Sequence, residues 1–314
     1  DGIRDDLVTG VQTCALPISA GTRWWRPVSV PLAHHPATMK FMSYGASSVP
    51  VGVWLFPDAT AQQMVDAVVR ADTAGFEEVW VADEGPMRDP AAVLAAAALR
   101  TTRCRLGVGI TSPVLRHPGA LAATWSTIDE LSEGRAILGL GLGGSLSLEP
   151  YGLEFERPVA LMRDAIRSAR AAMEARDGDG YRLMSHAAPA RQVPIFLAAK
   201  GEQLNRLAGR EADGVFLSGF RLDEVGRAVG WAREASRPVH VALYASVRFR
   251  SDAPDDPTAL CGEPEEVARG LLELVEAHRP ESIGMALIDG DDVGVMLERA
   301  VETLGHYRRL STRG

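Results

Sequence analysis

The sequence has little of several features that mark specialised proteins. Only three cysteines, Cys14, Cys104 and Cys261, occur among its 314 residues, and their wide spacing builds neither a disulfide framework nor a metal knuckle. No apolar run approaches the roughly 20 residues that a membrane helix needs. Basic residues are outnumbered, with 33 against 41 acidic ones and a formal charge of −8, so no electrostatic attraction to nucleic acid arises. We therefore expect a soluble, cytoplasmic protein with no metal, nucleic-acid or membrane partner.

What the sequence does contain is the composition of an ordinary globular chain. Hydrophobic residues make up 46% and charged residues 24%, which allows a core of normal size and excludes a disordered or fibrous protein. The length suits one large domain or two ordinary ones, and a single α/β barrel would fill it.

The N-terminal segment does not resemble the rest. Residues 1–19, DGIRDDLVTGVQTCALPIS, have no helical or strand period and lack the basic start and continuous apolar run of a secretory signal. They resemble a translated sequencing adapter. Residues 20–38 are rich in Pro, Trp and His without a pattern. We predict that residues 1–38 are not native, that the natural chain starts at Met39 or Met42, and that residues 39–314 form one domain.

From residue 51 onward, short apolar or β-branched runs alternate with amphipathic helical stretches, a rhythm typical of βαβ units. A capping box of Thr60 and Gln63 predicts where the first helix begins. The predicted strands are 51–55, 78–82, 105–110, 136–140, 195–198, 214–217, 239–247 and 282–287. The predicted helices start near 60, 90, 118, 158, 201, 223, 264 and 292. Eight strand–helix pairs favour a (β/α)8 TIM barrel over a doubly wound sheet, which usually ends after five or six strands.

In such a barrel, ligands bind at the C-terminal ends of the strands. This rule selects the loops that contain 56–57, 83–84, 110–112, 141–147, 198–201, 218–219 and 244–248. Small residues in these loops would let a flat ligand approach the backbone amides.

The glycine-rich run at 139–144 has two interpretations. A dinucleotide-binding fingerprint is disfavoured because the run follows the fourth strand, no helix is predicted directly behind it, and no acid ends a neighbouring strand about 20 residues on. The alternative is that Gly139 lets strands pack closely inside the barrel, whereas Gly143 and Gly144 lie in the loop.

Other reactive residue types have structural alternatives. Asp83 and Glu84 at a strand end are either a general acid/base pair or a cap with solvated charge. Lys200-Gly201 lacks the remaining parts of a phosphate loop. His117 before Pro118 favours a helix cap over a catalyst.

Two segments resemble a known family. LGVGITSP at 106–113 with RHP at 116–118, continued by TIDELSEGRA at 127–136, is similar to the third and fourth units of luciferase-like flavin- or deazaflavin-dependent oxidoreductases. VPIFLAAKG at 193–201 resembles the fifth unit. The branch most similar contains reductases of methylenetetrahydromethanopterin that use the deazaflavin coenzyme F420.

The resemblance implies a bacterial-luciferase-like TIM barrel with its cofactor in the mouth, against a bulge on strand three. A cis peptide between Gly109 and Ile110 is implied by position, and the connection at about 248–262 implies a shortened insertion after strand seven. Asp83 and Glu84 are implied as catalytic residues, with Glu84 where deazaflavin relatives usually have His. The implied cofactor-binding residues are Asp83, Gly109, Ile110, Thr111, Gly143, Ser147, Ala198, Ala199, Lys200, Gly201, Ser218 and Gly219.

The implied activity is hydride transfer between C5 of coenzyme F420 and an organic small-molecule substrate, within a homodimer. Three alternatives stay open. With FMN instead, which can form an oxygen adduct, the protein would be a monooxygenase. A barrel could bind a flavin without turnover. A barrel that handles sugars or phosphates would have no redox role at all.

Overall fold

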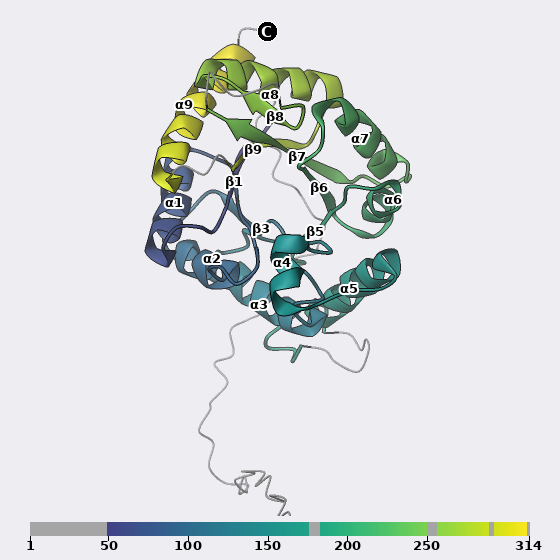
Figure 1. Cartoon of the computed structure of the whole chain (residues 1–314). Helices are drawn as coiled ribbons and strands as arrows, with labels where there is room; N and C mark the ends of the chain where they lie inside the picture. Colours follow the sequence, from purple (N-terminus) through teal and green to yellow (C-terminus); the bar gives the residue numbers. More distant parts are fainter. Residues whose placement is uncertain (1–48, 176–182, 250–255, 289–291, 313–314) are drawn as a thin grey trace, which may run out of the picture. The chain divides into compact units, whose positions relative to one another are not determined.

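Eight parallel strands hydrogen-bond to one another in a closed ring, with helices around its outside (Figure 1). The computed structural model describes residues 49–175, 183–249, 256–288 and 292–312. Strands β1 to β7 follow one another round the ring, and β9 pairs with both β7 and β1 to close it. The described chain is therefore a (β/α)8 TIM barrel, as predicted. Residues 1–38, predicted to be non-native, lie outside the described residues.

The ring and its helices have the following bounds. The strands are β1 Val51–Leu55, β2 Glu78–Val81, β3 Arg105–Val108, β4 Ala136–Leu140, β5 Ile195–Ala198, β6 Gly214–Ser218, β7 His240–Arg248, β8 Ala259–Cys261 and β9 Ser282–Leu287. The helices are α1 Ala61–Ala74, α2 Pro90–Ala98, α3 Pro118–Leu131, α4 Ser145–Leu148, α5 Pro158–Met173, α6 Glu202–Glu211, α7 Val225–Arg233, α8 Pro264–His278 and α9 Val293–Ser311, with 3-10 turns at Glu149–Tyr151 and Leu222–Glu224.

Several strand ends, such as those of β2, β6 and β7, are shifted by one residue from the sequence-based expectation, and three larger differences affect the mouth of the barrel. Strand β3 ends at Val108, two residues before the predicted end at Ile110. The short strand β8, in the connection after β7, was not predicted; it pairs with the end of β7 beyond the last residue that β6 reaches. A helix does begin directly behind the glycine-rich run, since α4 starts at Ser145, so that objection to a dinucleotide fingerprint was wrong.

Two predicted helix caps, at Thr60 and His117, are confirmed. The Thr60 hydroxyl accepts from the Gln63 backbone N–H, and the Gln63 side chain accepts from the Thr60 N–H, completing the capping box of α1. The His117 ring accepts from the Gly119 N–H at 3.1 Å, so His117 is the N-cap of α3. These caps satisfy backbone donors that the first turn of each helix leaves without an intrahelical partner.

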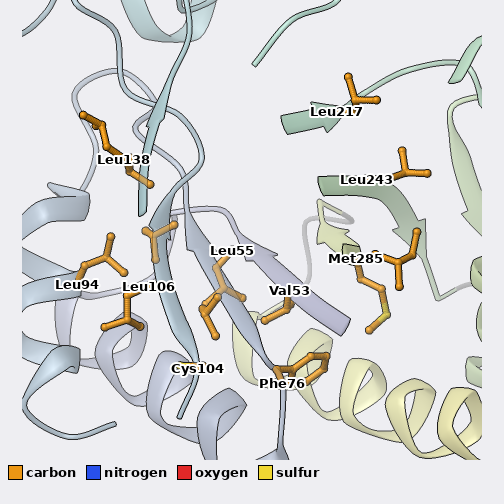
Figure 2. Close-up of a cluster of buried hydrophobic side chains, with 14 of the residues drawn as sticks. Val53, Leu55, Phe76, Leu94, Cys104, Leu106, Leu138, Leu217, Leu243 and Met285 are labelled. Atoms are coloured by element: carbon orange, nitrogen blue, oxygen red, sulfur yellow. The ribbon is translucent and has the colours of Figure 1, made fainter. Parts of the chain in front are cut away.

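The core has two layers. The outer layer packs alternate strand residues against the helices, and Figure 2 shows Val53, Leu106 and Leu138 of the strands with Leu94 of α2. The inner layer fills the barrel with large rings, above all Trp80, whose centroid lies 4.6 Å from that of Phe216. Alternation along each strand thus places one face inward and one outward, as a parallel barrel requires.

Glycines provide the room for these inner rings and for the close approach of strands. A Cβ at Gly284 would lie 2.2 Å from the Tyr244 ring, and a Cβ at Gly139 would lie 2.0 Å from the Val108 carbonyl oxygen. The interpretation of Gly139 as a packing glycine is therefore confirmed.

The N-terminal end of the barrel is closed by a buried polar cluster around Glu78, which is fully buried. Its carboxylate accepts from the Tyr244 hydroxyl at 2.8 Å and from the Trp80 indole at 3.1 Å, and it forms an ion pair with Arg105. Burial alone would raise the pKa of Glu78, but Arg105 and these donors hold it below its ordinary value. Tyr244 therefore belongs to the closed end of the barrel rather than to the loops at 244–248 that were predicted to surround the ligand.

Candidate functional site

A cavity of about 480 Å³ opens at the C-terminal ends of the strands, between the loops after β3, β4, β5 and β6. This volume is in the range of pockets that hold small molecules and cofactors. Ten of the thirteen predicted site residues line it: Glu84, Gly109, Ile110, Gly143, Ser147, Ala198, Ala199, Lys200, Gly201 and Ser218. We call this space the first cavity.

The wall contributed by β3 is a bulge. Gly107 pairs with Ile137, but the next pairing joins Thr111 to Leu140, so β3 uses one residue more than β4 over the same stretch. The peptide between Gly109 and Ile110 is cis, as the resemblance implies. The Trp54 indole donates to the Gly109 carbonyl, which fixes the bulge against β1.

Asp83 and Thr111 lie behind this wall and do not line the first cavity. The Thr111 hydroxyl donates to Asp83 at 2.6 Å, and Arg116 lies 3.5 Å from the same carboxylate oxygen. Burial raises the pKa of Asp83, although Thr111 and Arg116 oppose the shift. In this arrangement Asp83 holds the bulge through Thr111. Gly219, the third predicted residue outside the lining, follows β6 in a left-handed conformation.

Glu84 does face the first cavity. It is half-buried, and its carboxylate accepts from the Ser147 hydroxyl at 2.8 Å. Burial, and then the nearby charge of Asp83, raise the pKa of Glu84 above its usual range, while the Ser147 bond opposes the shift. A carboxyl with a raised pKa can keep its proton nearer neutral pH and so can donate or accept one.

One side of the first cavity is positively charged. Lys200 lines it directly after β5, and Gly201 is the N-cap of α6 without a side-chain cap bond. The first N–H groups of α6 are thus open to a ligand, and a helix N-terminus with a lysine beside it favours an anion.

A second cavity of about 400 Å³ adjoins the first and shares two lining residues with it, Trp54 and Glu84. Its other lining residues come from β1, α4, β9 and α9 and the loops beside them: Leu55, Phe56, Asp58, Leu146, Leu287, Ile288, Val293 and Met296.

Six residues of the first cavity are absent from the predicted set. Gly141, Leu142 and Gly144 belong to a loop that the barrel rule had selected. Trp54, Phe216 and Leu204 carry no motif. Trp54 and Phe216 are nevertheless inward-facing residues close to the C-terminal ends of β1 and β6, so strict strand alternation was the signal that could have found them.

The described residues contain neither a metal-ligand cluster nor a membrane-spanning helix. No group of three or more His, Cys, Asp or Glu side chains in the described ranges could hold a metal ion. None of the helices that the structure describes is long and apolar enough to cross a membrane.

A model of the luciferase-like monooxygenase family matches residues 42–253. The chain belongs to this family. A curated relative, the 5,10-methylenetetrahydromethanopterin reductase of Methanolobus tindarius, is 28% identical over 261 residues, covering 76% of this chain and 79% of the relative. The F420-dependent glucose-6-phosphate dehydrogenase of Intrasporangium calvum is 35% identical over 213 residues, which is 61% of this chain and 62% of the relative.

Among solved structures, the coenzyme F420 dependent tetrahydromethanopterin reductase of Methanopyrus kandleri has the same fold. It superposes with a TM-score of 0.69 at 21% identity, covering 83% of this chain and all of the other. Family and fold agree with the expected class, that of flavin- or deazaflavin-dependent oxidoreductases.

Proposed function

We propose that this protein transfers a hydride between coenzyme F420 and an organic small molecule, with the coenzyme in the first cavity. The observation that carries the proposal is the composition of that cavity: a backbone wall at Gly109–Ile110, small residues after β4 and β5, and one cationic side, at Lys200 and the N-terminus of α6. Coenzymes of this type combine a flat ring with a phosphate-bearing side chain, and these features fit both parts.

The residues would divide the work as follows. The Gly109–Ile110 backbone and the loop at Gly143 would hold the ring, and Lys200 with Gly201 would hold the phosphate end. When bound, the deazaflavin supplies a donor or acceptor of two electrons as hydride. Glu84, positioned by Ser147, would give a proton to the substrate atom that receives the electron pair, or take it back in the reverse direction.

Titration of the purified protein with F420 and, separately, with FMN tests the proposal. We expect F420 to bind with a change in its fluorescence, and Lys200→Glu to weaken that binding by at least about tenfold because it reverses the only lysine charge in the cavity lining. Arg163→Glu, on the exposed surface of α5, is the matched charge-reversal control and should leave the affinity unchanged.

The outcomes separate the alternatives. Tight FMN binding with no affinity for F420 would favour the monooxygenase. Binding of either coenzyme with no acceptor reduced across broad panels would favour a barrel without turnover, and absence of both would favour a barrel with no redox role.

A further inference from the structure

We infer that the second cavity binds the substrate, and that this substrate is an uncharged, largely apolar molecule with one polar group directed at Glu84. The inference rests on the proposed function, since it takes the first cavity as the coenzyme site. It goes further by naming the chemical class of the reaction partner.

The shape and lining of the second cavity support this class. Apolar side chains from three parts of the barrel, among them Phe56 after β1, Leu287 of β9 and Met296 of α9, form most of its wall. A volume of about 400 Å³ is sufficient for a molecule of one or two rings. Burial of apolar ligand surface against such a wall is favourable, whereas a charged group there would lose its hydration without replacement.

The charges of the second cavity exclude an anionic substrate. Among the residues that the structure describes, its ionisable lining residues are two acids, Asp58 and Glu84, and none is Lys, Arg or His. The first turn of α9 contributes Val293 and Met296 to the wall, but its N-terminus is already capped by the Asp292 carboxylate, which accepts from the Gly294 N–H at 2.8 Å. A phosphate or carboxylate would therefore meet carboxylates where it needs a cation.

The shared residues determine where the polar group lies. Glu84 and Trp54 line both cavities, so a molecule in the second cavity that hydrogen-bonds to Glu84 lies next to the first cavity as well. A hydroxyl that donates to the Glu84 carboxylate, or a carbonyl that accepts from its protonated form, is a polar group that this arrangement satisfies. The remaining surface of the molecule then faces the apolar wall.

Isothermal titration calorimetry with two matched probes tests the inference. Benzylideneacetone is an uncharged aryl ketone, and cinnamate has the same apolar body with a carboxylate in place of the methyl ketone. With the F420-loaded protein, in which the coenzyme occupies the anion-favouring first cavity, we expect the ketone to bind at least about tenfold more tightly than cinnamate, and glucose 6-phosphate to bind no better than cinnamate.

A charge placed in the second cavity should reverse the preference. Ile288 lines it and is 40% exposed, so Ile288→Lys is expected to fold, to weaken ketone binding and to strengthen cinnamate binding. Leu99→Lys is the control, since Leu99 is 70% exposed at the C-cap of α2 and contributes to neither cavity. Its affinities for both probes should match those of the unchanged protein, and circular dichroism should show the same fold for both variants.

Failure of the inference and failure of the proposed function are distinguishable. If F420 binds but cinnamate or glucose 6-phosphate binds as tightly as the ketone, or if Ile288→Lys leaves the preference unchanged, the substrate class is wrong and the proposed function stands. If F420 does not bind, the proposed function fails, and the inference, which depends on it, fails too, whatever the ketone does.

Discussion

Asp83 and Glu84 are neighbours in the chain, yet their side chains have different surroundings. Asp83 is held by Thr111 and Arg116 behind the wall of the first cavity, whereas Glu84 reaches both cavities and is held by Ser147. The sequence could not decide between an acid/base pair and a structural cap. The geometry separates the two acids: Asp83 supports the bulge, and Glu84 faces both cavities, where the proposed function has it exchange a proton.

The hydroxyl of Ser147 should control the proton affinity of Glu84. Ser147→Ala removes a donor that stabilises the carboxylate, so we expect the already raised pKa of Glu84 to rise further. Carbon-13 NMR titration of the glutamate carboxyls, assigned with Glu84→Gln, measures this pKa. Ser218→Ala, which changes another hydroxyl of the same cavity, is the control. A Glu84 pKa that falls or stays unchanged in Ser147→Ala would show that the bond is not formed in solution.

At the scale of the element, the close approach of β3 and β4 is possible because Gly139 has no side chain. Gly139→Ala would place a methyl 2.0 Å from the Val108 carbonyl oxygen, and backbone in a closed barrel cannot move aside easily. We expect the free energy of unfolding to fall by at least about 3 kcal/mol, measured by urea denaturation.

The control for that substitution lies in a helix. Gly230 of α7 has nothing within 4 Å of an added Cβ, so Gly230→Ala should raise the free energy of unfolding by about 0.5–1 kcal/mol through helix propensity. If both variants lost stability equally, the close approach at Gly139 would not be the cause.

The elements differ in how well their sequence predicts them. β1, β4, β5 and β9 have the predicted bounds and α8 begins at the predicted Pro264, because apolar runs, glycines and prolines delimit them locally. β8 has only three residues and exists through its pairing with the end of β7, a contact that no local pattern encodes. The early end of β3 likewise depends on a bulge defined against β4.

The same distinction holds for the site. Loop residues such as Gly143 and Ser147 could be predicted from the barrel rule and the family resemblance. Trp54 and Phe216 were missed because a large inward ring in a strand resembles any core residue until the depth of the cavity is known. The position of Asp83 behind the wall depends on its bond to Thr111, 28 residues away, which the sequence alone does not place.

At the scale of the whole molecule, the closed end of the barrel makes stability depend on pH. Burial, with Arg105 adding to it against the opposing charge of Glu78, lowers the pKa of His240 from about 6.5 to about 4. Between these values the unfolded chain binds a proton that the folded one does not, so the free energy of unfolding falls as the pH falls from about 6.5 towards 4.

Urea denaturation at pH 7.5 and pH 5 measures this effect. We expect His240 to account for a loss of roughly 2 kcal/mol over that interval. His240→Gln keeps a polar side chain beside Ser282, which lies 2.9 Å from the histidine ring nitrogen, and removes the titration, so its loss should be smaller by about the same amount. Equal losses in both proteins would mean that His240 is protonated in the folded barrel.

The two cavities share Trp54, Glu84 and helix α4 but otherwise use different strands of the ring, and this has a consequence for how such a protein can diversify. The remaining lining of the first cavity, the proposed coenzyme site, belongs to β3 to β6 and the segments after them, whereas that of the second comes from β1, β9 and α9 and the loops beside them. Under the proposed division of work, exchanges at Leu287, Val293 or Met296 change which substrate is accepted and leave the coenzyme site unaltered. A lineage that varies these positions would gain new substrates and keep the same coenzyme-binding site.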